Sequence, residues 1–150
     1  MSVADEPRVT LRDVVADDIP WFFEQQSDVE ASEMVGFPVR TWDAFTAHWA
    51  RILDDETGVV RTIVVDSQVA GNVVSFVQYR ERKVGYWLGR EFWGKGVATL
   101  ALSAFLTDEQ RHPLYAHVAR HNLASRRVLE KCGFTLAGEE PDEYRLELLE

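Results

Sequence analysis

The residues of this chain best suited to chemistry form a turn between Phe92 and Thr99, with the order Phe-Trp-Gly-Lys-Gly-Val-Ala-Thr. Apolar periodicity after the turn predicts that a helix begins there. A glycine turn that opens a helix presents free main-chain N–H groups and the positive end of the helix dipole. Such a turn binds anions, and a phosphate or diphosphate fits it best. The segment therefore predicts a site for a phosphorylated cofactor, with a simple packing turn as the competing interpretation.

Two elements must position this turn, a short strand before it and an amphipathic helix after it. Residues 84–88 are apolar and aromatic and are bounded by glycine, which is typical of a buried strand. The helix is expected to bury one face, formed by Val97, Leu100, Ala101, Ala104 and Phe105. The sequence has neither the Walker pattern nor the dinucleotide-binding glycine fingerprint, so the two common nucleotide folds do not explain the turn.

The remaining patterns predict a mixed α/β (α+β) protein whose helices pack against one sheet. Strands are expected over 8–14, 59–65, 69–79, 84–88, 114–119, 134–137 and 144–149. Helices are expected over 17–26 and 41–53, from residue 97 onward, and over 122–132. Asp17 and Asp18 are expected to cap the first helix, residues 80–83 to form a turn, and residues 34–38 to form a loop.

Composition and charge limit the classes of protein to which the chain can belong. Its 150 residues, 46% of them hydrophobic, suit one domain over 1–150. A net charge of -9 argues against nucleic-acid binding. One cysteine excludes an intrachain disulfide, and we find no signal peptide or membrane-length apolar run, so a cytoplasmic protein is expected. The four histidines lack ligand spacing, so no metal site is expected.

A second motif follows the glycine turn, with Asn122, Ser125 and Gly133-Phe134 spaced as Asn-x-x-Ser…Gly-Phe. Together with Gly85–Leu88 and Trp93–Thr99, it resembles the GNAT N-acetyltransferase superfamily, and most closely its ribosomal-protein N-acetyltransferase-like branch. The resemblance implies a central, mostly antiparallel sheet with a splayed strand pair, flanked by about four helices. It also implies acetyl-coenzyme A as cosubstrate, held where the strand at 86–88 splays from the strand at 114–119.

The resemblance assigns the cosubstrate to residues near the turn. The superfamily's diphosphate signature falls on 93–98, with Trp93 in place of the usual glutamine or arginine. Main-chain N–H groups make most of those contacts, so this substitution leaves the assignment intact. The residues expected to bind acetyl-coenzyme A are Trp87, Leu88, Trp93, Gly94, Lys95, Gly96, Val97, Ala98, Thr99, Asn122 and Ser125.

Acetyl transfer from a thioester to an amine needs a base for the amine, a donor for the oxyanion and an acid for the leaving thiolate. The resemblance implies a main-chain N–H near Trp87 and Leu88 as the oxyanion donor. It implies the hydroxyl of Ser125 as the acid. The competing interpretation of Ser125 is an ordinary serine at a helix start, bonded to local backbone.

The base stays open among four residues, Asp28, Glu33, Glu81 and His117. Relatives often carry a glutamate just before the Gly-Tyr-Trp motif, where this chain has Lys83 and Val84. Glu33 is the first candidate, because the region between the first two predicted helices borders the acceptor site in relatives. Glu81 is otherwise a solvated turn charge and His117 a hydrogen-bonded structural imidazole, and a water chain could also deprotonate the amine.

The sequence therefore predicts an enzyme that transfers acetyl from acetyl-coenzyme A to a primary amine by direct attack in a ternary complex. The acceptor is expected to be a protein N-terminus or a small-molecule amine, with Phe37 and Trp42 as candidates to line its pocket. Neither nucleic acid nor membrane is an expected partner, and the protein is expected to be a monomer or homodimer. The alternatives are a catalytically inactive module that binds acyl-coenzyme A as a sensor or scaffold, and a purely structural interaction domain.

Overall fold

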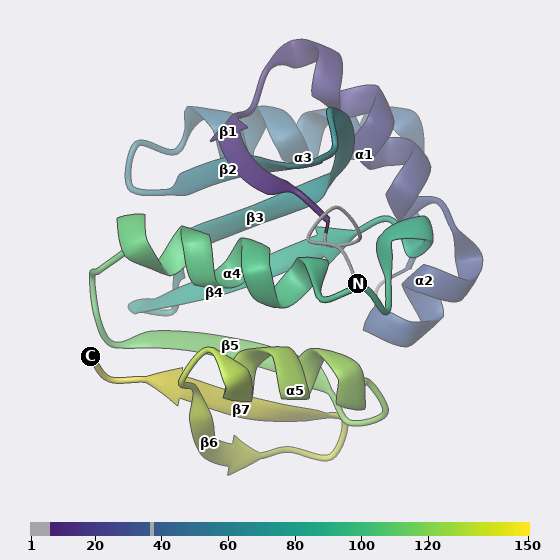
Figure 1. The fold of residues 1–150 in the computed structure, drawn as a ribbon. Helices are drawn as coiled ribbons and strands as arrows, with labels where there is room; N and C mark the ends of the chain where they lie inside the picture. The colour runs from purple at the N-terminus through teal and green to yellow at the C-terminus, as the bar shows by residue number, and fades with distance from the viewer. Residues whose placement is uncertain (1–6, 37) are drawn as a thin grey trace.

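Residues 7–36 and 38–150 are described by a computed structural model, in which seven strands form one sheet (Figure 1). In chain order they are β1 (Val9–Asp13), β2 (Val59–Val65), β3 (Gln68–Gln78), β4 (Glu81–Leu88), β5 (Leu114–Ala119), β6 (Thr135–Glu139) and β7 (Glu143–Leu148). Across the sheet the order is β1-β2-β3-β4-β5-β7-β6. Neighbours are antiparallel apart from the parallel pair β4 and β5. The predicted mixed, mostly antiparallel sheet is confirmed.

Helices cover both faces of this sheet. The α-helices are α1 (Ile19–Gln26), α2 (Val29–Val35), α3 (Trp42–Asp54), α4 (Val97–Asp108) and α5 (Leu123–Lys131). Short 3-10 turns, η2 (Ala16–Asp18) and η3 (Arg90–Phe92), precede α1 and the glycine turn. In Figure 1, α4 and α5 lie in front of the sheet and α3 lies behind it.

Each face of the sheet has its own apolar core, because successive strand residues point to opposite faces. The core on the α4 and α5 face includes Val84, Leu88, Phe105, Leu114, Ala116, Val118, Leu129 and Leu146. The core on the α1 and α3 face is formed by Phe22, Phe45 and Trp49, with Val60, Val69 and Val74 packed against it. This alternation decides which side chains of β4 and β5 point to which face.

The helix α2 was not predicted, and it occupies part of the segment expected to be a loop. Asp28 caps it by accepting hydrogen bonds from the main-chain N–H groups of Glu30 and Ala31, and Gly36 ends it with φ 90°. Its seven residues bury only Ala31 and Ser32. An amphipathic stripe is therefore missing from its sequence, which explains why periodicity did not reveal it. Phe37 lies outside the described residues.

The predicted turn over 80–83 is wrong, because β4 begins at Glu81. The turn consists of Tyr79 and Arg80, both with positive φ (52° and 65°), and Gln78 pairs directly with Glu81. Two consecutive positive-φ residues make the tight hairpin turn that matches strand twist. Arg82 lies inside the strand, paired with Val77, and its guanidinium donates to the carbonyl of Thr57. Charge alone was therefore a poor signal for the turn.

The buried face of α4 is rotated from the predicted one. Val97, Ala101 and Phe105 are buried as expected, but Leu100 is 48% exposed and Ala104 also faces solvent. Leu102 is buried in their place. A helix made almost wholly of apolar residues offers several possible stripes, so its contacts with the sheet decide which one is buried.

Asp18 does not cap α1 as predicted, since its side chain makes no cap hydrogen bond there. It is 2% exposed and accepts two hydrogen bonds from the Arg12 guanidinium, at 2.7 and 2.8 Å. It also accepts from the main-chain N–H of Val15 at 3.0 Å and from the Thr62 hydroxyl at 2.7 Å. Burial alone raises the pKa of this carboxyl, but the donors outweigh burial and lower it. Asp18 thus connects β1, η2 and β2.

Replacing Asp18 with alanine should lower the free energy of unfolding by about 3 kcal/mol, because Arg12 and the buried Thr62 lose their partner. Asp18→Asn tests the charge separately. A depressed native pKa contributes stability above the unfolded pKa, and this contribution disappears as pH falls through the native pKa. Urea unfolding should therefore show the difference between wild type and Asp18→Asn shrinking below about pH 4. Exposed Asp17→Asn is the control and should change little.

Candidate active site

The main irregularity of the sheet is the splay of β4 away from β5, here called the parting. In the described chain their parallel ladder consists of two residue pairs, Arg82 with Leu114 and Lys83 with Tyr115. Beyond these pairs β4 continues alongside β3 as far as Leu88, and β5 continues alongside β7. The predicted splay is therefore confirmed. Main-chain groups on the two facing edges are left available to a ligand that enters the parting.

The glycine turn lies just beyond the end of β4 and leads into α4. Gly94 and Gly96 have φ of 75° and 78°, a conformation that favours glycine. Among the residues that the structure describes, no heavy atom would lie within 4 Å of a Cβ at either position. Gly96 is the N-cap of the 12-residue α4, and the first main-chain N–H groups of a helix have no partner within it. The turn can therefore hold an anionic diphosphate close to the backbone.

Trp93 ties the glycine turn to the strand. Its indole Nε1 donates a hydrogen bond of 2.9 Å to the main-chain carbonyl of Leu88, the last residue of β4. The side chain thus fixes where the turn begins relative to the parting. That contact gives Trp93 a structural role, beside the predicted one in cosubstrate binding.

Ser125 and Asn122 start α5 on the same face as α4. Asn122 caps the helix, its side-chain oxygen accepting from the N–H of Ser125 at 3.2 Å, as predicted for a capping residue. The Tyr86 hydroxyl donates to Oγ of Ser125 at 3.0 Å. Burial, opposed in part by this hydrogen bond, raises the pKa of Tyr86, so the phenol stays protonated and remains a donor.

Tyr86 is a site residue that the sequence analysis missed. It lies within the Gly85–Leu88 motif, between Val84 and Leu88, which both belong to the core under α4 and α5. Strand alternation alone therefore directs Tyr86 toward that face. The contact with Ser125, 39 residues away, could not be read from local pattern.

Trp87 points to the opposite face, toward α1 and α3. It is 8% exposed, and its cross-strand partner Asn72 is 4% exposed. The indole Nε1 of Trp87 and the amide Nδ2 of Asn72 are both buried without a hydrogen-bond partner among the described residues. Buried donors left unpaired are costly, so this face suits an incoming polar group. The predicted role of Leu88 N–H as oxyanion donor stays a prediction.

Two of the four candidate bases form ion pairs with arginines. Asp28 caps α2 and accepts from Nε of Arg90 at 3.0 Å. Glu81 pairs with Arg145 of β7, so the interpretation of Glu81 as a solvated turn charge is wrong. Both carboxylates are therefore committed to contacts within the protein.

The other two candidates differ in burial. The Glu33 side chain is exposed on α2, and its main-chain carbonyl accepts from Nε2 of His121 at 2.8 Å. The catalytic role of Glu33 stays a prediction. His117, on β5, has Nδ1 at 3.0 Å from Oε1 of Glu143 and a buried, unpartnered Nε2 among the described residues. The hydrogen bond at Nδ1 agrees with the interpretation of His117 as a structural imidazole, but that interpretation gives no role to Nε2.

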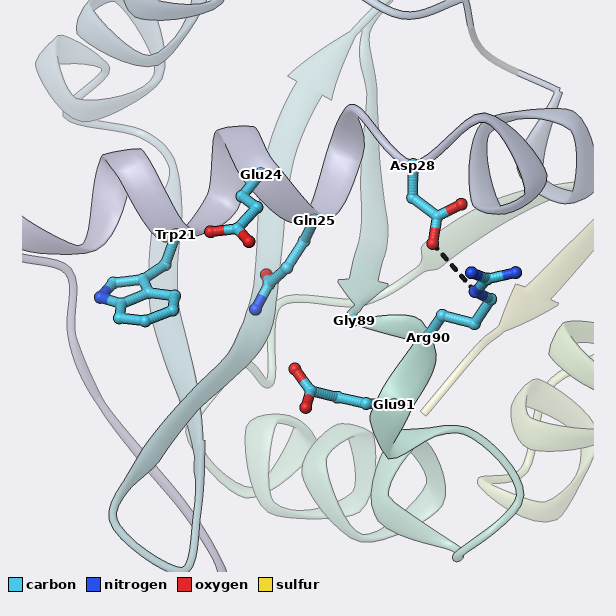
Figure 2. A pocket seen from close by; sticks show the side chains of 7 residues that line it. All are labelled: Trp21, Glu24, Gln25, Asp28, Gly89, Arg90 and Glu91. Atoms are coloured by element: carbon cyan, nitrogen blue, oxygen red, sulfur yellow. Dashed lines mark ion pairs between the residues drawn. The ribbon is translucent and has the colours of Figure 1, made fainter.

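A polar pocket of about 510 Å³ lies between α1 and the segment that follows β4 (Figure 2). Its lining comprises Trp21, Glu24, Gln25, Asp28, Gly89, Arg90 and Glu91. Figure 2 shows Glu24 and Glu91 on opposite sides of the pocket and Arg90 paired with Asp28. The pocket shares Asp28 with the candidate bases but contains none of the predicted cosubstrate residues. Trp42, proposed for an acceptor pocket, is 44% exposed and packs edge-on against Phe23.

Among the described residues, no group of three or more histidine, cysteine, aspartate or glutamate side chains is placed to hold a metal ion. No helix of the described chain is long and apolar enough to cross a membrane.

Comparison with known proteins identifies the family to which this geometry belongs. Residues 8–135 match the family model of the acetyltransferase (GNAT) domain. The chain belongs to the GNAT acetyltransferase family. No curated protein matches the sequence at a significant level.

Solved structures share the GNAT fold at low sequence identity. A GNAT-family acetyltransferase from Bacillus anthracis superposes with a TM-score of 0.79 at 19% identity, covering 95% of both chains. A spermidine N-acetyltransferase from Vibrio cholerae, solved with coenzyme A and spermine, gives 0.80 at 21% identity, covering 94% of this chain and 95% of the other. RimL, a ribosomal L7/L12 α-N-protein acetyltransferase solved with coenzyme A, gives 0.79 at 18% identity, covering 94% and 93%. At these identities the likeness shows the fold.

Membership of the GNAT family gives the enzyme class. The chain is an acetyl-coenzyme A-dependent N-acetyltransferase, and acetyl-coenzyme A is its cosubstrate. The glycine turn fits that cosubstrate, because no atom of the described residues lies within 4 Å of where a Cβ of residue 94 or 96 would project. The assignment of individual residues to binding and catalysis is a separate question.

Proposed function

We propose that this GNAT enzyme transfers acetyl to a primary amine by direct attack in a ternary complex at the parting of β4 and β5. The observation that carries the proposal is that this parting and the open glycine turn lie at the same end of β4. A diphosphate held at the turn leaves a connected thioester arm free to lie between the strands. The amine then approaches from the face that carries Trp87. We further propose that residues 1–150 act as one cytoplasmic acetyltransferase domain, as a monomer or homodimer.

In this arrangement the α5 face supplies the acid. Ser125 lies in the first turn of α5, and the hydrogen bond from Tyr86 leaves the serine proton free to point elsewhere. That proton goes to the leaving sulfur, and the buried phenol stabilises the serine oxygen that remains. A main-chain N–H near Leu88 polarises the thioester carbonyl.

The acceptor class is a primary amine, either a protein N-terminus or a small molecule. The similar structures include enzymes whose names specify spermidine and a ribosomal protein N-terminus. The sequence motifs favour the ribosomal-protein N-acetyltransferase-like branch. The net charge of -9 supports a cationic acceptor of either kind.

An acceptor screen tests the proposal in two stages. Calorimetry first measures the Kd for acetyl-coenzyme A, and mass spectrometry then looks for acetylated products among short peptides, spermidine and an aminoglycoside. Binding followed by an acetylated product supports the proposal. Binding without product or thiol release from any amine favours the inactive sensor or scaffold, and absence of binding overturns both.

Replacing Ser125 with alanine should lower kcat roughly ten- to a hundredfold, because the sulfur then leaves without a proton donor. The loss should fall at the low end of the rate contributions that general acid catalysis makes, since a thiol of pKa about 8.5 leaves readily as thiolate. Tyr86→Phe should act in the same direction, and the double variant should lose less than the sum of the two. Stopped-flow thiol release measures this. Exposed Ser103→Ala is the control, and an unchanged kcat in Ser125→Ala contradicts the acid assignment.

A further inference from the structure

His117 lies at the parting of the sheet but on the face opposite Ser125. It is two residues beyond Tyr115, the last residue of β5 that pairs with β4. Its neighbours Ala116 and Val118 belong to the core under α4 and α5, so alternation directs the imidazole to the other face. That is also the face of Trp87 on β4. The imidazole and the serine hydroxyl therefore lie on opposite sides of the same parting.

The two ring nitrogens of His117 have different environments. Nδ1 is 3.0 Å from Oε1 of Glu143 on β7, and because a carboxylate only accepts, Nδ1 carries the proton. In the neutral imidazole, Nε2 then carries the lone pair. It is buried and has no hydrogen-bond partner among the described residues. A carboxylate that orients an imidazole whose other nitrogen is free is the arrangement of a positioned general base.

The charges around His117 preserve this arrangement. Its cross-strand neighbour on β7 is Arg145. That guanidinium is paired with Glu81 and stacks 4.1 Å from the Tyr115 ring, so it does not compete for Glu143. Glu143 is therefore available to orient the imidazole.

We propose that His117 is the general base for the acceptor amine and that Glu143 positions it, an inference that rests on the proposed function. Nε2 takes one proton from the ammonium, and the neutral nitrogen attacks the thioester carbon to form the C–N bond. The C–S bond breaks, its electron pair goes to sulfur, and sulfur takes the Ser125 proton. The second proton released by the amine nitrogen restores the Ser125 hydroxyl. His117 returns its own proton to solvent as the products leave.

Two amines of nearly equal size test the role of His117 directly. At pH 7 ethylamine is protonated and needs a base, whereas 2,2,2-trifluoroethylamine is already neutral. With acetyl-coenzyme A as donor, His117→Gln should lower kcat/KM for ethylamine about a hundredfold. It should lower kcat/KM for the fluorinated amine far less, and calorimetry should find the Kd for acetyl-coenzyme A unchanged. Exposed His112→Gln is the matched control and should leave both rates unchanged.

The same two amines test Glu143 as a positioning residue, through the ratio of kcat/KM for ethylamine to kcat/KM for 2,2,2-trifluoroethylamine. Glu143→Ala should lower the ethylamine rate more than the fluorinated-amine rate. Glu143→Gln keeps an oxygen that accepts from Nδ1, so it should restore most of the loss. A purely structural role would lower both rates together.

The possible outcomes separate the two proposals. Equal losses with both amines, or no loss in His117→Gln, overturn the base assignment while the proposed function stands. A selective loss for ethylamine in Glu33→Gln but not in His117→Gln also overturns it. A wild-type protein that binds acetyl-coenzyme A but acetylates no amine overturns the proposed function, and the base assignment with it.

Discussion

Replacing Gly71 with alanine should remove most of the stability of this protein. An alanine Cβ at this position would lie 2.0 Å from the main-chain oxygen of Trp87 and 3.0 Å from Cα of Leu88. Both contacts are with backbone inside the β3–β4 ladder, where Gly71 pairs with Leu88. A side chain cannot rotate to relieve them, so one of the strands must move. We expect the free energy of unfolding to fall by at least about 3 kcal/mol.

Urea unfolding followed by tryptophan fluorescence measures this loss. Gly138→Ala is the matched control, because the nearest atom to its new Cβ is 4.0 Å away. That variant should stay within about 0.5 kcal/mol of wild type. Equal stabilities of the two variants would mean that β3 and β4 are not as closely packed at this point as described.

Replacing Gly96 with aspartate should weaken acetyl-coenzyme A binding roughly two-hundredfold, if the diphosphate lies on the glycine turn. Two unit charges 5 Å apart repel by about 3 kcal/mol at an effective dielectric constant of 20. The fold should tolerate the change. Aspartate and asparagine are the residues other than glycine that adopt positive φ most readily, and both suit a helix N-cap.

Gly96→Asn separates charge from bulk, because it has the same shape and the same tolerance of φ 78°. Calorimetry should show a much smaller loss of affinity for asparagine than for aspartate, and added salt should narrow the gap. Thermal unfolding checks that both variants are folded. Equal affinities in the two variants would place the diphosphate elsewhere.

Local sequence pattern predicted the parts of the fold that local physics determines. The glycine turn at 94–96, the helix start at Val97 and the Asn122 cap follow from residue type and neighbouring periodicity. The mostly antiparallel sheet was instead implied by the resemblance to the GNAT superfamily and not by local pattern. By contrast, α2 was missed because Ala31 and Ser32 are its only buried residues.

The contacts proposed to act in catalysis depend on tertiary placement, and sequence pattern alone left them open. Tyr86 meets Ser125, and His117 meets Glu143, 39 and 26 residues apart. The first contact joins strand β4 to helix α5, and the second joins β5 to β7, which no hairpin connects. No local pattern encodes either placement. Asp18 shows the same limit. Its position before a helix favoured a cap, yet Thr62, 44 residues away, binds its carboxylate.

The short parallel ladder also affects how this fold can vary between species. Two residue pairs join the first four strands to the last three, so the sheet has a seam at its centre. Side-chain packing beneath α4 and α5, more than backbone pairing, holds the halves together. Packed apolar contacts tolerate substitution of similar volume better than a ladder tolerates a shift of register. Each half can therefore accept substitutions independently of the other. This agrees with a fold that is shared by chains only 19% identical in sequence.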